Sequence, residues 1–177
     1  FSKVTLNRGD DVAVSVKRSG KGYAVDVNGS VLDARSLIKQ FTSDVDTATK
    51  TTGSDAISVS ADVDQLIGFH DEQLSNLKLD YSAVGSRVNG LKVSATASSG
   101  AAITINNTTG DGRRALNVQS ADAGAILRFL NIYEHMEGGS ITLALAGASD
   151  GPMKGKVDTT NFFVVNEPKL ASIVSTT

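Results

Sequence analysis

The chain contains no cysteine and no tryptophan, and only two of its 177 residues are histidines. The absence of cysteine excludes disulfides and thiolate metal sites. Aromatic residues make up 5% of the chain, so an apolar core or surface must be built mainly from Val, Leu, Ile and Ala. His70 and His135 have acidic neighbours, but neither cluster has the i, i+4 spacing of a helical zinc site. The sequence therefore predicts neither a bound metal nor a cofactor.

Clusters of basic residues and long apolar runs are also missing. Lysine and arginine are scattered along the chain, and the net charge of −2 provides no general attraction for nucleic acid. No apolar run approaches the roughly 18–20 residues that span a bilayer, so we predict no transmembrane segment in this stretch. No serine, histidine or carboxylate residues have the spacing of a catalytic centre, so we do not expect an enzyme.

Alternation of apolar and polar residues dominates the chain. Val12, Val14 and Val16 share one face of a first predicted strand, and small or polar residues lie between them. Similar runs follow at Tyr23–Val27, Ile57–Val63, Leu77–Tyr81, Leu91–Ala95, Ile103–Ile105, Leu116–Val118 and Ile141–Leu145. Strands with one apolar and one polar face are typical of an antiparallel sheet wetted on one side. The pattern predicts a mainly β fold with short helices (α+β), in which a curved antiparallel sheet has one apolar face.

Pairs and triplets that contain glycine indicate the turns of this sheet. Asn28-Gly29, Asn89-Gly90 and the triplet 110–112 have the composition that tight hairpins favour. We interpret all three as turns between strands.

Three segments depart from the alternation and share a helical pattern. Asp33, Asp122 and Asn166 each precede apolar residues at the spacing of one helical stripe. Aspartate and asparagine are good N-caps because their side-chain oxygens accept hydrogen bonds from the first free N–H groups of a helix. The pattern predicts short amphipathic helices over 33–41, 122–132 and 167–175.

A polar, threonine-rich stretch over 43–55 predicts a loop. It divides the chain into an N-terminal hairpin-plus-helix module over 1–42 and a larger curved sheet over 56–177. The alternative is one continuous domain.

The predicted apolar face is the one feature with a functional interpretation. It forms either an ordinary core beneath the helices or a partly open aliphatic groove that holds acyl chains. The residues expected on this face, and therefore the candidates for lipid contact, are Val25, Val59, Leu79, Leu91, Val93, Ile103, Leu143 and Leu145.

The region 113–175 carries a resemblance to a known family. It contains the helix start Asp122–Gly124, the pair Gly138-Gly139 before a strand, the spacing Gly151–Gly155 and a run through Phe163, Val165 and Leu170. In these features it resembles the C-terminal region of the AsmA-like proteins of the bacterial envelope. Near the start of the chain, GKGYAVDVNGSVLDARSLI is similar to the preceding module of that family.

The resemblance implies a non-enzymatic, periplasmic segment of a long curved β-sheet, in a parent protein anchored to the inner membrane by an N-terminal helix. It implies that a phospholipid or another acyl-chain ligand slides along the apolar face, in support of outer-membrane lipid homeostasis. Because the chain starts at Phe1 without a signal peptide, we interpret it as a piece of such a protein. The alternative is a structural or assembly module with a closed core, which binds an envelope protein through its sheet edges or helices.

Overall fold

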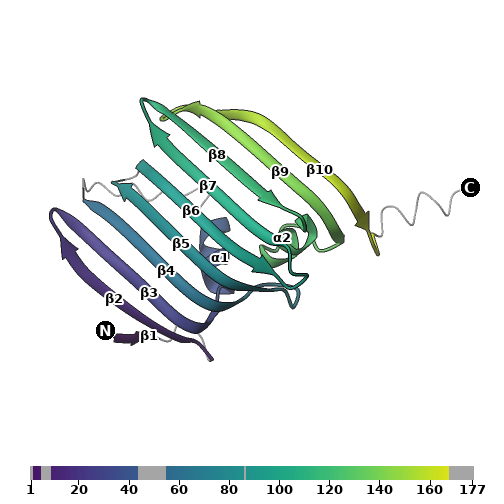
Figure 1. Cartoon of the computed structure of the whole chain (residues 1–177), viewed down its shortest axis with the longest axis horizontal. Helices are drawn as coiled ribbons and strands as arrows, with labels where there is room; N and C mark the ends of the chain where they lie inside the picture. The colour runs from purple at the N-terminus through teal and green to yellow at the C-terminus, as the bar shows by residue number, and fades with distance from the viewer. Residues whose placement is uncertain (1, 5–8, 44–54, 86, 168–177) are drawn as a thin grey trace, which may run out of the picture.

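The computed structural model describes residues 2–4, 9–43, 55–85 and 87–167. These residues form one open sheet whose strands lie side by side in the order in which they occur along the chain (Figure 1). The strands are β1 (Ser2–Val4), β2 (Asp11–Ser19), β3 (Gly22–Asp33), β4 (Ala56–Ile67), β5 (Gln73–Val84), β6 (Arg87–Ala97), β7 (Ala102–Gly110), β8 (Arg113–Ser120), β9 (Met136–Ala148) and β10 (Met153–Val164). The described helices are α1 (Arg35–Ser43) and α2 (Ala123–Phe129). The prediction of a mainly β chain with short helices is therefore confirmed.

The sheet is mixed, which corrects the prediction of a purely antiparallel one. β3 and β4 run parallel, with Val25 opposite Val59, whereas every other neighbouring pair is antiparallel. Parallel neighbours need a long crossover connection, and α1 lies in that connection. The alternation along a strand does not reveal its partner's direction, which explains the error. The sheet is continuous across the stretch 43–55, where the sequence suggested a division; residues 44–54 lie outside the described residues.

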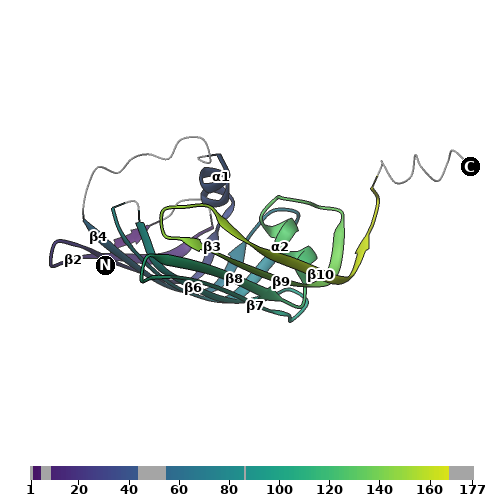
Figure 2. The ribbon, with the colours of Figure 1, turned by 90° about the horizontal axis from the view of Figure 1, so that it is seen from above.

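Both helices lie on the same side of the sheet (Figure 2), and each follows a strand, β3 or β8, that finishes at the same end of the sheet. We call this end, where β3, β4, β6 and β8 finish, the helix end, and the opposite end, which carries the turns after β2, β5, β7 and β9, the hairpin end. Neither described helix has the length and apolar character that crossing a membrane requires.

The two described helices begin where their aspartates predict. Asp33 accepts a hydrogen bond from the N–H of Arg35 at 3.0 Å, just before α1. Asp122 caps α2 by accepting the N–H of Ala125 at 2.9 Å. α2 is shorter than predicted because the chain leaves the helix after Phe129, and Asn131 adopts a left-handed φ of 56°. The third predicted helix, over 167–175, lies outside the described residues except for its first residue.

The core lies between the helices and the helix end of the sheet. Ile38 of α1 and Phe129 of α2 are buried there. The sheet residues of the same buried cluster are Val12, Leu32, Val63, Leu66, Leu74, Leu77, Ala95, Ala97 and Ile103. Gly68 passes directly beneath the ring of Phe129, where an added Cβ would lie 2.2 Å from a ring carbon.

Two of the three glycine signals mark bulges and not turns. Gly29 lies inside β3, at a shift of register between β2 and β3, and an added Cβ would lie 2.2 Å from the backbone oxygen of Asp11. Asn89 and Gly90 lie inside β6, at a shift of register against β5. Glycine favours bulges and close backbone approaches as it favours turns, so the dipeptide alone does not separate the two. The triplet 110–112 does connect β7 to β8, as predicted.

Candidate ligand-binding face

Strand pairing decides which residues share a face, because directly opposed residues point the same way and successive residues point to opposite sides. Val25 lies opposite Val59, and Val59 lies opposite Tyr81. Leu79, two residues before Tyr81, lies opposite Val93. The candidates from β3, β4, β5 and β6 therefore share one face.

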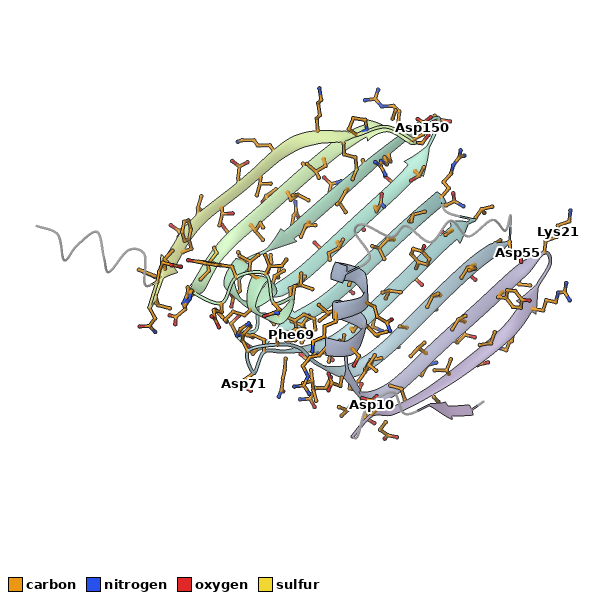
Figure 3. The ribbon with its side chains drawn as sticks, turned by 180° about the vertical axis from the view of Figure 1, so that it is seen from behind. Asp10, Lys21, Asp55, Phe69, Asp71 and Asp150 are labelled. Atoms are coloured by element: carbon orange, nitrogen blue, oxygen red, sulfur yellow. The ribbon has the colours of Figure 1, made fainter. Side chains whose placement is uncertain are left out.

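The same face continues into the second half of the sheet. Ile103 lies opposite Ala95, two residues after Val93. Across β8 and β9, Val118 lies opposite Leu143 and Leu116 opposite Leu145. All of the candidates thus lie on the face that contains the core cluster, which we call the inner face because both helices are on that side (Figure 3).

Exposure on the inner face rises with distance from the helices. Ile103, at the helix end, is 3% exposed and belongs to the core, whereas the other candidates are partly exposed. Towards the hairpin end, Ile57 is 38% exposed and Tyr23 is 46% exposed. The described helices therefore bury one end of this face and leave aliphatic side chains accessible towards the other.

The opposite face carries polar and charged residues. Asp62 and Lys78, directly opposed in β4 and β5, form an ion pair of 3.2 Å with both side chains more than half exposed. The alternating residues of β6 on this face are Lys92, Ser94 and Thr96. Because both side chains are exposed to solvent, this ion pair contributes roughly 0–1 kcal/mol to stability.

A shallow hollow of about 460 Å³, the central hollow, extends over β3 to β7. Its lining includes Val25, Val59, Tyr81 and Leu91 from the inner face, and residues of the opposite parity such as Ser58 also border it. Three of the candidates therefore meet in one concavity.

A buried ion pair fixes α2 against the sheet. Arg128 of α2 donates from Nε to Glu72 Oε1 at 2.7 Å and also donates to the backbone oxygen of Met136. Glu72 is 8% exposed and accepts a further hydrogen bond from Ser98 at 3.0 Å. Ser99 donates to Asp122 Oδ2 at 2.6 Å, which ties the cap of α2 to the turn between β6 and β7. These contacts hold α2 against the sheet and provide hydrogen-bond partners for the polar side chains at the helix end.

The two histidine clusters converge on one carboxylate, which the sequence did not indicate. Glu134 lies 3.0 Å from His70 Nδ1 and 3.7 Å from His135 Nε2. His70 Nε2 is also 2.7 Å from Asn131 Oδ1, so it connects the turn after β4 to the segment after α2. Within the described ranges, no group of three or more His, Cys, Asp or Glu residues is arranged to hold a metal ion.

A second concavity at the hairpin end was missed by the sequence analysis. This arginine hollow, of about 370 Å³, is lined by Arg87, Val88, Asn107, Thr109, Arg114, Ser149 and Asp150. Arg114 lies opposite Thr109 and on the same face as Leu116 and Val118, where the alternation otherwise places apolar residues. The sequence contained one signal of this hollow. An arginine at a position where the alternation expects an apolar residue needs a hydrogen-bond partner or solvent.

The two hollows offer an aliphatic surface and a neighbouring concavity lined by two arginines and one aspartate. Comparisons of the chain with protein-family models, with curated proteins and with solved structures found no match.

Proposed function

We propose that this chain is a non-enzymatic segment of an AsmA-like protein of the bacterial envelope. Its inner face forms part of an aliphatic groove along which phospholipid moves through the periplasm. The acyl chains lie against the strands while the headgroup remains near the rim. No covalent step is required, because displacement along an apolar track changes only which side chains the lipid contacts.

The observation that supports this proposal is the partial cover of the inner face. A closed core would bury the candidates of β3 to β6 as completely as Ile103, but these side chains stay partly exposed beyond the described helices. Each methylene removed from water by such a surface contributes about 0.8 kcal/mol. Even a few methylenes per strand would therefore hold an acyl chain without a deep pocket.

Native mass spectrometry with lipid extraction tests the proposal. The chain purified from bacterial cells should carry phospholipid at a defined stoichiometry. A lipid-free mass that persists after incubation with phospholipid vesicles would contradict the groove and favour the closed, protein-binding module.

A matched pair of substitutions connects binding to the inner face. Leu143 and Thr142 are neighbours in β9, but only Leu143 points to the inner face. A charge at Leu143 has to remain solvated where an acyl chain would lie, so Leu143→Asp should reduce bound lipid at least about tenfold. Thr142→Asp, at an exposed position of the reverse face, should leave it unchanged. Circular dichroism checks that both variants fold, and equal losses of lipid would count against the inner face as the binding surface.

One observation favours a second function, assembly through the sheet edge. β10 pairs with β9 along its length and is the last strand of the sheet. Val157 and Phe163 on this strand are 56% and 71% exposed. An unpaired strand edge can take up a strand from another protein. Lys154 and Lys156 lie on the same strand, and edge lysines are a common defence against such pairing, so we rank this function second.

A further inference from the structure

We propose that the arginine hollow binds the phosphate of a phospholipid whose acyl chains lie in the central hollow, with a preference for headgroups that carry a hydrogen-bond donor beside the phosphate. This inference rests on the proposed lipid-carrying function and adds to it the position and the chemistry of the headgroup site.

The first support is the unsatisfied guanidinium of Arg114. Its Nη2 donates to the backbone oxygen of Gly151 at 2.6 Å, which holds the side chain against the turn between β9 and β10. Its Nε is buried and, among the described residues, has no acceptor. Arginine stays protonated in proteins, so this N–H is a donor that the described residues leave unused. Arginine is also the side chain best matched in geometry to phosphate oxygens.

The second support is an acceptor close by. Asn107 Oδ1 is buried and has no donor within the described part of the chain. Asn107 lies opposite Leu116, two residues from Arg114 in β8, so the two side chains are diagonal neighbours on the inner face. Thr109 does not meet this need, because its hydroxyl already donates to the backbone oxygen of Val88 at 2.8 Å. The residues that line the hollow therefore include one donor and one acceptor that have no partner among the described residues.

These two atoms define a class of headgroup. The buried N–H of Arg114 pairs with a phosphate oxygen, and the oxygen of Asn107 pairs with an N–H or O–H of the group esterified to that phosphate. Phosphatidylethanolamine has both groups, phosphatidylcholine lacks the donor, and diacylglycerol lacks the phosphate. Arg87 adds positive charge at the rim and Asp150 adds a carboxylate, which matches a phosphate beside an ammonium group.

The two hollows adjoin. Asn107 lines both the central hollow and the arginine hollow, so a single lipid can reach from one to the other. Figure 3 shows Asp150 at the hairpin end, away from the helices and from Phe69. The headgroup would therefore lie at the end of the inner face that the described helices leave accessible.

Competition between lipids tests the inference. The purified chain is incubated with vesicles that contain equal amounts of phosphatidylethanolamine, phosphatidylcholine and diacylglycerol with identical acyl chains. It is then re-isolated, and the bound lipids are quantified by mass spectrometry. We expect phosphatidylethanolamine to exceed each of the others about tenfold, as one charge-assisted hydrogen bond provides. Arg114→Met should bring the ratio of phosphatidylethanolamine to diacylglycerol to within about twofold of unity while total bound lipid persists.

Arg113 provides the matched control. It is the exposed neighbour of Arg114 and points to the reverse face, so Arg113→Met should retain the full preference. Asn107→Leu removes the acceptor and fills its space, and it should abolish the preference over phosphatidylcholine. This variant tests the headgroup site if Arg114→Met does not fold. Equal uptake of the three lipids by the unmodified chain, or an unchanged preference in Arg114→Met, would overturn the headgroup site and leave the groove standing. Absence of all bound lipid would overturn the groove itself.

Discussion

At the scale of single residues, Glu72 is a buried carboxylate that joins two other segments of the helix end. It is 8% exposed and holds Arg128 of α2 and Ser98 of the turn after β6. Removing one partner of a buried ion pair leaves an uncompensated charge, so Glu72→Ala should lower the free energy of unfolding by about 3–5 kcal/mol. Urea denaturation followed by circular dichroism measures this loss.

Lys78 provides the comparison for Glu72. Its ion pair with Asp62 is exposed, so Lys78→Ala should change the free energy of unfolding by less than about 1 kcal/mol. Similar losses in the two variants would mean that the Glu72–Arg128 pair is not buried in solution.

Asp33 gives the chain a specific dependence on pH. The side-chain hydrogen bond from Arg35 is the main cause that holds the pKa of Asp33 below its ordinary value. A carboxyl whose pKa is lowered by folding contributes stability above its unfolded pKa, and this contribution disappears as the pH falls through its folded pKa. Arg35→Gln should therefore raise the pKa of Asp33 towards the ordinary value, lower the stability of the chain above the unfolded pKa, and reduce the part of that stability which acid removes.

Carbon-detected NMR titration of the Asp33 carboxyl measures its pKa directly. Asp62, whose ion pair partner is Lys78, serves as the internal reference because Arg35 does not contact it. An unchanged titration of Asp33 in Arg35→Gln would contradict the assignment of the cause.

At the scale of elements, α2 depends on the residue that caps its N-terminus. It spans Ala123–Phe129, too short to be stable alone. Asp122 caps it, and Ser99 anchors the cap. Asp122→Ala should cost about 1–2 kcal/mol and speed amide hydrogen exchange in α2, whereas Asp122→Asn keeps an oxygen acceptor and should cost less. Equal exchange rates in the two variants would show that the cap is not what holds the helix.

The elements show which parts of the structure the sequence predicts and which it does not. The aspartate before each described helix and the alternation within each strand are local signals, so the positions of those elements and the shared face of Val25 to Leu145 follow from them. Asn76 shows the limit. It adopts a φ of 54° next to a shift of register between β5 and β6, so Leu74 and Leu77 are both buried although their spacing is odd. A bulge depends on the neighbouring strand, which a linear pattern does not contain.

The candidate site divides in the same way. Its aliphatic members follow from alternation, but the arginine hollow needs β6, β7, β8 and the turn after β9 to meet. The parallel pairing of β3 with β4 and the convergence of His70 and His135 on Glu134 likewise depend on tertiary contacts between distant segments.

At the scale of the whole molecule, stability should be uneven along the sheet. The core cluster joins α1, α2 and the helix ends of β2 to β7, whereas β10 is exposed along most of its length. Amide protons of β4 and β5 should therefore exchange slowest and those of β10 at least about a hundredfold faster. Hydrogen exchange with mass spectrometry resolves this gradient. Uniform protection from β4 to β10 would mean that the edge is covered in solution, as the assembly function requires.

The coincidence of spatial order and chain order has a consequence for how such a sheet can vary. Each strand hydrogen-bonds to the strands before and after it in the chain, so the sheet behaves as a one-dimensional array of nearest neighbours. Hairpins can be added to or removed from either margin of such an array without re-pairing the strands that remain. The width of the sheet, measured across its strands, can then change during evolution in steps of one hairpin, about 10 Å at the usual spacing between strands. Duplication or loss of the gene segment that encodes a hairpin changes the width of the sheet and leaves the length and pairing of the remaining strands unchanged.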